Sequence, residues 1–182
     1  MNTCKQHPLE KFHYCPVCGS PHFEIHDEKS RKCRECGFEY YFNPSAAYVA
    51  IILNEKNELL VCRRKKEPAK DTLDLPGGFA DCCETGEEGV AREVKEETGL
   101  EVVSTHYLFS LPDTYLYSGF LIHTLDNFYL CRVAGWENLQ ALDDAAELYW
   151  IPFERLEPRQ FGLDSIRNGV MKLKRDLFKS LR

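Results

Sequence analysis

The chain has 182 residues, of which 29 are acidic and 23 basic, and its net charge is −6. The hydrophobic fraction of 43% and the aromatic fraction of 12% are typical of a globular protein and exclude a chain that is mostly disordered. The acidic balance disfavours bulk binding of nucleic acid, although a divalent cation can still join acidic side chains to an anionic phosphate ligand.

The expected location follows from two patterns in the sequence. No run approaches the length of apolar sequence that a membrane-spanning helix needs. Residues 1–8 lack the apolar core of a secretory signal. We therefore expect a cytoplasmic protein without membrane contact, in a reducing compartment where its nine cysteines do not form disulfides.

The first predicted unit is a cysteine-rich segment within residues 1–43. Cys15 and Cys18 form one Cys-x-x-Cys knuckle, Cys33 and Cys36 form a second, and 14 residues separate the two knuckles. Four thiolates at this spacing complete a tetrahedron around one Zn²⁺ and leave no coordination position open for catalysis. We therefore predict a structural zinc ribbon. A redox-active thiol pair is the alternative, but one shared ion explains a duplicated knuckle better.

The second predicted unit, residues 44–182, has the alternating strand and helix pattern of an α/β domain. Apolar runs predict strands, and apolar residues at helical spacing predict helices. In chain order we expect strands at 46–53 and 58–64 that form a hairpin, a Gly-Gly segment at the end of 73–79, a helix at 85–98, strands at 102–109, 121–123, 128–133 and 148–151, and a helix at 163–181.

The predicted helix at 85–98 carries an unusual group of three glutamates. Glu93, Glu96 and Glu97 fall within an arc of about 100° on one helix face. Carboxylates this close repel one another, and hard cations such as Mg²⁺ or Mn²⁺ relieve the repulsion because they prefer oxygen ligands. The pattern therefore favours a metal site over a solvated acidic face.

The residues around these glutamates complete one long pattern. Gly78, Glu84, Arg92 and Gly99 occupy the fixed positions of G-x5-E-x7-R-E-U-x-E-E-x-G-U, in which U is aliphatic. An ion pair between Arg92 and Glu84 would hold the loop against the helix. This pattern is the signature of the Nudix hydrolase family, which the chain resembles over residues 44–182.

The resemblance implies an α/β/α sandwich with a mixed sheet and a metal-dependent hydrolase that acts on nucleoside diphosphate derivatives. By position, Glu93 and Glu97 would be the principal ligands of Mg²⁺ or Mn²⁺, with Glu96 a third ligand or a partner through water. The other positions of the implied site are the Gly78 carbonyl in the metal shell, and Glu84 and Arg92 as residues that orient the carboxylates.

The family often places a further acidic residue on a later strand or loop. Glu147 is the candidate in this chain, and Asp143 and Asp144 are weaker ones. An ordinary surface carboxylate is an equal alternative for Glu147. The general base stays open among Glu96, Glu97 and Glu147.

A zinc ribbon before a Nudix domain resembles the arrangement in NADH pyrophosphatases. That subfamily carries the motif S-Q-P-W-P-F-P-x-S shortly after the Nudix signature. Residues 110–118 of this chain are S-L-P-D-T-Y-L-Y-S. Two serines and one proline match, and Tyr115 replaces the phenylalanine. Tyr115 and Tyr117 would stack on a base or a nicotinamide ring, although packing in a hairpin or at a dimer contact explains them equally well.

These features predict an enzyme that splits a nucleoside diphosphate linked to another moiety, of the NADH/NAD or ADP-ribose type, into two phosphate monoesters. The alternative is a nucleotide-sensing binding module whose zinc ribbon docks to protein or nucleic acid. From the habit of the family we expect a homodimer, and we do not expect nucleic acid as a partner. The roles of Cys82 and Cys83 stay open.

Overall fold

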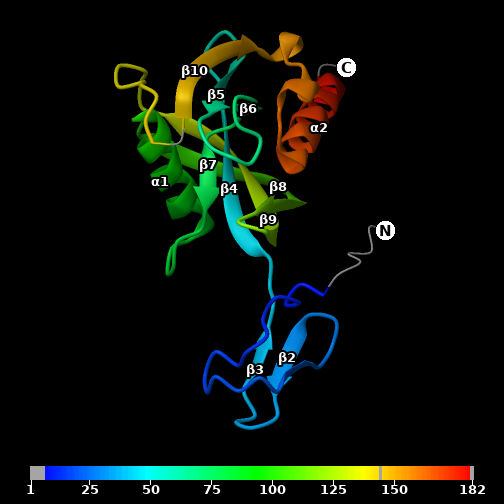
Figure 1. Cartoon of the computed structure of the whole chain (residues 1–182). Coiled ribbons are helices and arrows are strands. Elements are labelled where there is room, and N and C mark those ends of the chain that lie inside the picture. The colour runs from blue at the N-terminus through cyan, green and yellow to red at the C-terminus, as the bar shows by residue number, and fades with distance from the viewer. Residues whose placement is uncertain (1–6, 144, 181–182) are drawn as a thin grey trace.

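The computed structural model describes residues 7–143 and 145–180, with side chains up to residue 176. It consists of a small N-terminal lobe and a larger body that carries both helices (Figure 1). No helix in these described ranges is long and apolar enough to cross a membrane. The elements in chain order are β1 Phe23–Ile25, β2 Ser30–Cys33, β3 Glu39–Tyr41, β4 Ser45–Ile52, β5 Glu58–Arg64, β6 Leu73–Asp74, β7 Gly77–Phe79, α1 Gly86–Thr98, β8 Val102–Tyr117, β9 Phe120–Val133, β10 Ala145–Pro152, the short 3-10 helices Phe153–Arg155 and Pro158–Gln160, and α2 Asp164–Ser180.

The N-terminal lobe is an antiparallel sheet of three short strands in the order β1-β2-β3. Among the residues that the structure describes, its apolar cluster consists of Phe23, Phe38 and the buried cysteines Cys15 and Cys33, and Leu9 is also fully buried. This small apolar area provides little hydrophobic stabilisation. The lobe therefore needs another source of stability.

The body contains a four-stranded sheet in the order β7-β4-β9-β8 and a three-stranded sheet in the order β10-β5-β6. Strands β4 and β9 run parallel while their other neighbours run antiparallel, so the larger sheet is mixed, as predicted. The predicted hairpin of residues 46–53 and 58–64 is wrong, because β4 and β5 belong to different sheets and meet only at an isolated bridge between Leu53 and Leu59. Strand β4 pairs with β7 and β9 along its two edges, which leaves no edge for β5.

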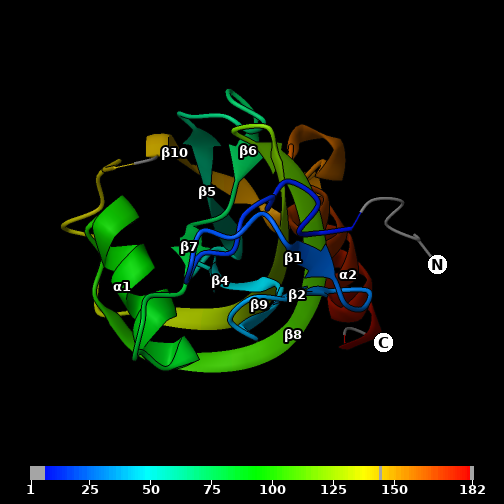
Figure 2. The same ribbon diagram turned by 60° about the horizontal axis from the view of Figure 1, so that its bottom comes forward.

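Two helices lie on opposite sides of these sheets (Figure 2). Strand β4 is buried on both faces, which explains its continuous apolar sequence. One face packs in a cluster with α2 and the other in a cluster with α1, which confirms the α/β/α arrangement. The first cluster includes Val49, Ile51, Phe128, Ile166 and Val170, and the second includes Tyr48, Ala50, Ile52, Val90 and Val94.

Helix α1 has well-defined ends, in agreement with the predicted range 85–98. Thr85 accepts a hydrogen bond from the Glu88 amide, and the Glu88 side chain accepts one from the Thr85 amide, which forms a capping box. At the other end, Gly99 adopts the left-handed conformation with φ of 72°, a common helix stop. These caps fix where the helix begins and ends.

Strands β8 and β9 form one long hairpin, which the sequence analysis divided into shorter pieces. The predicted strands 121–123 and 128–133 are a single strand in the structure. The polar residues Thr124 and Asp126 interrupt the apolar pattern of β9, yet both are buried. The prediction was wrong here because these side chains face a cavity inside the body rather than solvent.

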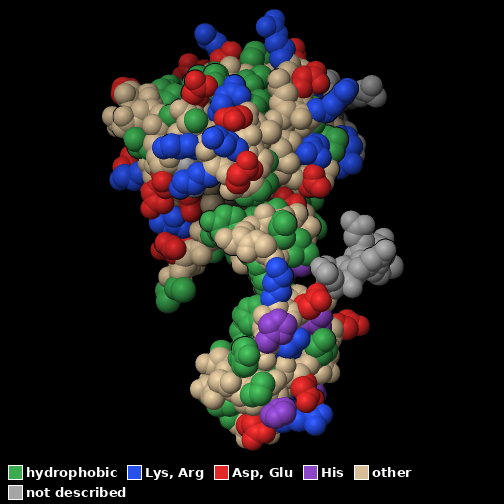
Figure 3. Space-filling view, in the orientation of Figure 1, with side chains coloured by type: hydrophobic (Ala, Val, Ile, Leu, Met, Phe, Trp, Pro, Cys, Tyr) green, Lys and Arg blue, Asp and Glu red, His purple; other side chains and the backbone are tan. Residues whose placement is uncertain are grey.

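The tip of this hairpin contacts the N-terminal lobe, and Figure 3 shows the two parts joined over a narrow neck. The Phe120 ring packs edge-on against the rings of Phe12 and Phe42, at centroid distances of 5.7 and 6.4 Å. Phe42 also contacts His123, and Lys11 Nζ donates a hydrogen bond to the Gly119 carbonyl. The lobe therefore supports the end of the hairpin from outside the body.

Candidate active site

The four predicted zinc ligands come together in the N-terminal lobe. The Sγ atoms of Cys15, Cys18, Cys33 and Cys36 all lie within 4.8 Å of one another. Two of these distances are 3.7 Å, between Cys15 and Cys36, and 3.6 Å, between Cys18 and Cys33. A tetrahedron with Zn–S bonds of about 2.3 Å has edges of about 3.8 Å. The donor set and its spacing therefore fit a zinc ion.

The backbone around Cys33 favours the thiolate form of that residue. The amide N–H of Cys36 hydrogen-bonds the Cys33 sulfur and lowers the pKa of that thiol to about 6. Gly19 and Gly37 follow the two knuckles with φ of 73° and 76°, a conformation that residues with a Cβ rarely adopt. With four protein ligands around one ion, this site is suited to a structural role rather than to catalysis.

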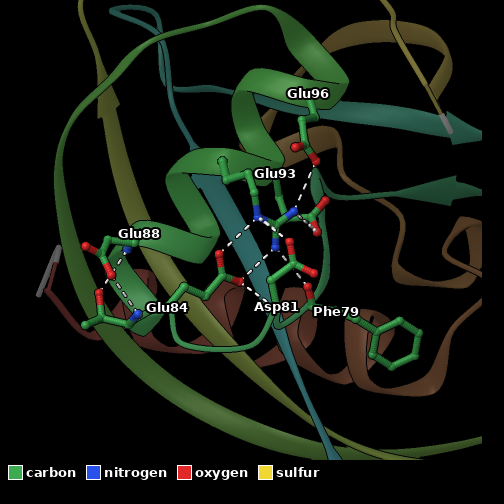
Figure 4. Close-up of polar contacts among 8 residues, drawn as sticks. Phe79, Asp81, Glu84, Glu88, Glu93 and Glu96 are labelled. Carbon is green, nitrogen blue, oxygen red and sulfur yellow. Dashed lines mark hydrogen bonds and ion pairs between the residues drawn. The ribbon is translucent and has the colours of Figure 1, made fainter.

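Arg92 hydrogen-bonds several carboxylates of the Nudix-type motif, and Figure 4 labels three of them, Glu84, Glu93 and Glu96. Its guanidinium donates to both oxygens of Glu84, with Nε–Oε2 and Nη2–Oε1 distances of 3.0 and 2.8 Å, which confirms the predicted pairing. It also donates to Glu93 at 2.8 Å, to Glu96 at 3.0 Å and to the Phe79 carbonyl at 3.0 Å. The guanidinium beside Glu84 lowers the pKa of that carboxyl to about 2. One cation therefore links the loop before α1 to the carboxylates on the helix.

Glu93 and Glu97 both lie against the Gly77–Gly78 segment of β7. The Gly77 amide donates to Glu97 Oε2 at 3.0 Å, and Glu97 is only 8% exposed. A Cβ added at Gly78 would lie 2.5 Å from Glu93 Oε1, so only glycine allows the strand to approach this carboxylate so closely. Burial raises the pKa of Glu93, although Arg92 opposes the shift.

Glu96 lies apart from this pair. Its side chain is half exposed and bonds Arg92 on the outer side of the helix. Among the described residues, the cysteine cluster is the only group of three or more ligand side chains that converges within 4.8 Å, so the three glutamates share a helix face without meeting at one point. Carboxylates of Glu93 and Glu97 with the Gly78 carbonyl form an oxygen donor set of the kind that Mg²⁺ and Mn²⁺ prefer.

A cavity of about 190 Å³ opens beside these residues. Glu97, Gly77 and Gly78 line it at the motif, and Tyr115 also lines it. Tyr117 is 56% exposed and does not line this cavity, but it lines a second groove that Tyr115 also lines. The two tyrosines that the sequence analysis grouped as substrate-binding candidates therefore meet at this second groove, and Tyr115 also lines the cavity.

Several polar residues in the cavity wall were not identified from the sequence. They are Arg64, Asp74, Asp113, Thr124 and Asp126. For Thr124 and Asp126, the sequence signal is their position at alternate residues of β9, whose other buried residues are apolar. Arg64 Nη1 forms an ion pair with Asp74, and burial raises the pKa of Asp74 while Arg64 opposes the rise.

Glu147, the candidate for a further acidic residue, does not line the cavity. It lies on β10, its side chain is 59% exposed, and it pairs with Arg63 at 3.2 Å. The Asp143 carbonyl accepts a hydrogen bond from Lys65, and Asp144 lies outside the described residues. A chemical role for Glu147 stays a prediction.

Comparison with known proteins agrees with this geometry. Residues 43–171 match the family model of the NUDIX domain. An ADP-ribose pyrophosphatase of Methanocaldococcus jannaschii is 36% identical over 139 residues, which cover 75% of this chain and 79% of that protein. An NAD-capped RNA hydrolase, NudC, of Vibrio vulnificus is 31% identical over 106 residues, which cover 58% of this chain and only 40% of that protein.

The solved structures show the same fold. A NUDIX hydrolase from Nitrosomonas europaea aligns over 85% of this chain and 86% of that chain, with a TM-score of 0.66 and 19% identity. A MutT NUDIX hydrolase from Burkholderia pseudomallei covers 71% of this chain and 98% of that chain, with a TM-score of 0.62 and 23% identity. With a complete signature, a matching family model and this fold, the chain belongs to the Nudix hydrolase family.

Proposed function

We propose that this Nudix hydrolase cleaves ADP-ribose into AMP and ribose 5-phosphate in a reaction that depends on Mg²⁺ or Mn²⁺. The observation that carries the proposal is the position of Glu93 and Glu97 beside Gly77–Gly78, a segment that lines the cavity together with Glu97. The pyrophosphatase relative matches over most of its own length and supports the same substrate.

The residues have distinct tasks in this proposal. Glu93, Glu97 and the Gly78 carbonyl would hold the metal, with Glu96 as a ligand or a partner through water. When bound, the ion supplies charge neutralisation at the phosphates and activation of water. Arg92 and Glu84 orient these carboxylates through the ion pairs described above. A carboxylate of the motif accepts the proton of the attacking water, and the two products are phosphate monoesters.

The test compares turnover of ADP-ribose by the wild type and by Glu97→Gln, with Mg²⁺ or Mn²⁺ and after chelation. We expect the wild type to release AMP only with the metal, and Glu97→Gln to be slower by about 100-fold or more. Glu87→Gln is the matched control, because Glu87 is an exposed glutamate on the same helix and outside the signature. Equal turnover by wild type and Glu97→Gln would contradict the role of Glu97.

A second candidate substrate class is NAD, NADH or an NAD-type cap. Its support is the groove next to the cavity, which is lined by Phe79, Tyr115 and Tyr117 together with Arg64 and Lys66. Aromatic rings beside cations suit a second heterocycle and its phosphate. The NudC relatives are named for NAD-capped RNA, so the expectation that this chain does not bind nucleic acid stays a prediction. In this case Tyr117→Ala would reduce kcat/KM for NADH while that for ADP-ribose changes little.

The other predictions also remain proposals. A binding module would hold ADP-ribose without metal-dependent turnover, which the assay above separates from an enzyme. The homodimer can be checked by light scattering of the purified protein. The cysteines among the described residues are free thiols, which is consistent with the proposed cytoplasmic location.

A further inference from the structure

Two buried carboxylates share one hydroxyl in the wall of the cavity. Asp113 on β8 and Asp126 on β9 are 7% and 6% exposed, and Ser165 at the start of α2 is fully buried. Asp113 and Asp126 both line the cavity, away from the metal-binding motif. Buried carboxylates are costly unless they are paired or neutral, so their hydrogen bonds define their charge.

The Ser165 hydroxyl lies within hydrogen-bond distance of both carboxyl groups. Its Oγ is 3.2 Å from Asp113 Oδ2 and makes a still shorter contact with Asp126 Oδ2. A hydroxyl has one proton to donate, so it serves one carboxylate only. The other carboxyl group must donate its own proton to Oγ. One of the two aspartates is therefore a neutral acid.

The backbone identifies which aspartate keeps its charge. Asp113 accepts hydrogen bonds from the amides of Thr114, at 2.7 Å, and Ser165, at 3.3 Å. The Ser165 amide belongs to the first turn of α2, where the helix favours a negative charge. Asp113 is thus the carboxylate, and Asp126 is the neutral acid that donates to Ser165.

The cation Arg64 lines the same cavity as Asp126. It is engaged by Asp74 and by the Pro68 carbonyl. Tyr115, Asp74 and Asp113 are close enough to interact electrostatically with Asp126. Burial raises the pKa of Asp126, contacts with the Ser165 and Thr124 side chains oppose the rise, and the negative charge of Asp113 adds to it. Lys65, Lys66 and Glu97 line the same cavity.

A second polar group, the Thr124 hydroxyl, lies near Asp126. Thr124 is 4% exposed and lines the cavity, and its side chain is close enough to lower the pKa of Asp126, but no hydrogen bond of good geometry joins its Oγ1 to a described residue. A buried hydroxyl without a hydrogen bond of good geometry costs free energy that a ligand can recover. Together, the neutral Asp126 and Thr124 place an acceptor and a donor in the same wall.

We propose that Asp126 and Thr124 bind the amino-bearing edge of the substrate's adenine ring, and that Ser165 and Asp113 are positioning residues that keep Asp126 neutral. The proposal rests on the proposed function. The adenine amino group donates to Asp126, and the adjacent ring nitrogen accepts from Thr124. A cavity of about 190 Å³ is smaller than the roughly 300–1,000 Å³ of sites that enclose a whole ligand, so it suits one ring of the substrate. Glu97, which lines the same cavity, then lies beside the diphosphate of the substrate.

The experiment measures binding of AMP and of purine riboside 5′-monophosphate, which lacks the amino group, by calorimetry on the full chain. We expect the wild type to bind AMP about tenfold more tightly, because one hydrogen bond to Asp126 is lost with the analogue. Asp126→Asn should keep this preference, since its amide donates to Ser165 and its carbonyl accepts from adenine. Asp126→Ala should lose this preference. Thr124→Val should weaken the binding of AMP and of the analogue alike.

The comparison of Asp126→Asn with Asp126→Ala provides a readout that a purely structural role would not move. Only the asparagine keeps both a donor to Ser165 and an acceptor for the adenine amino group, so only this variant should still distinguish AMP from the analogue. Thermal melting establishes that each variant is folded. Loss of the preference in folded Asp126→Asn, or equal binding of AMP and the analogue by the wild type, would overturn the proposal. These assays need no turnover, so they are independent of the Glu97→Gln test of the proposed function.

Discussion

Arg92 donates two parallel hydrogen bonds to Glu84, eight residues earlier in the chain, at 3.0 and 2.8 Å. The same guanidinium reaches Glu93 and Glu96 on its own helix. A planar fork with five donors can serve these groups together, whereas the ammonium group of lysine is a single point charge. The pair therefore sets the geometry of the whole acidic face.

The first prediction concerns Arg92→Lys. We expect kcat for ADP-ribose to fall by about tenfold or more, because the lysine keeps the charge but not the bidentate contact with Glu84. Arg175→Lys on α2 is the control, since Arg175 is an exposed arginine with one ion pair to its neighbour Asp176. Steady-state kinetics at saturating metal checks the result, and an unchanged kcat in Arg92→Lys would count against the orienting role.

The second prediction concerns acid stability. The pKa of Glu84 is lowered from its usual 4.5 to about 2 in the folded state, so its stabilising contribution is present above about pH 4.5 and is lost as pH falls toward 2. Glu84→Gln should therefore be less stable than the wild type at pH 7, and the difference should shrink below pH 4.5. Urea denaturation at a series of pH values measures this, and a difference that stays constant down to pH 3 would contradict it.

The third prediction concerns Gly78→Ala. Its Cβ would lie 2.5 Å from Glu93 Oε1, so the carboxylate has to move out of its place beside β7. We expect a large loss of activity and a raised metal requirement, with little change in melting temperature. Gly135→Ala is the matched control, because its Cβ would also meet the end of a glutamate side chain, that of Glu137, but this glutamate lies outside the motif. Titration of activity with Mg²⁺ separates the two variants.

The fourth prediction concerns zinc and its effect at a distance. Cys33→Ser should lose bound zinc and lower the melting temperature, because the lobe has almost no apolar core of its own. Since the lobe contacts the hairpin tip through Phe12, Phe42 and Phe120, we also expect KM to rise more than kcat falls. Cys82→Ser, at an exposed cysteine outside the cluster, should retain zinc. Elemental analysis of both variants decides the matter, and full zinc content in Cys33→Ser would exclude the four-cysteine site.

Local patterns in the sequence were enough for the zinc ligands and the acidic helix. Cys15 and Cys18 are neighbours at a spacing that already defines a ligand pair, and the three glutamates share a helix face through the helical repeat alone. The capping residues Thr85 and Gly99 likewise act within a few residues of their own position. Such features depend on short-range geometry, which a sequence pattern specifies directly.

The partners of these groups needed the fold. The sequence placed strands β4 and β5 in one hairpin, and the structure separates them into two sheets because β4 is paired along both of its edges. The sequence pattern also predicted a break in β9 at Thr124 and Asp126. In the structure the strand is continuous, and both residues are buried in the cavity wall.

By itself, the sequence determined the family, the fold class, the Nudix signature and the cysteine cluster, since each depends on residue types at short and regular spacing. Only the tertiary structure decided that the Ser165 hydroxyl contacts both Asp113 and Asp126. It also decided that Tyr115 lines the cavity whereas Tyr117 does not. The physical reason is distance along the chain. Asp113 and Ser165 are 52 residues apart, and no local periodicity encodes a contact that forms only when α2 packs on the hairpin.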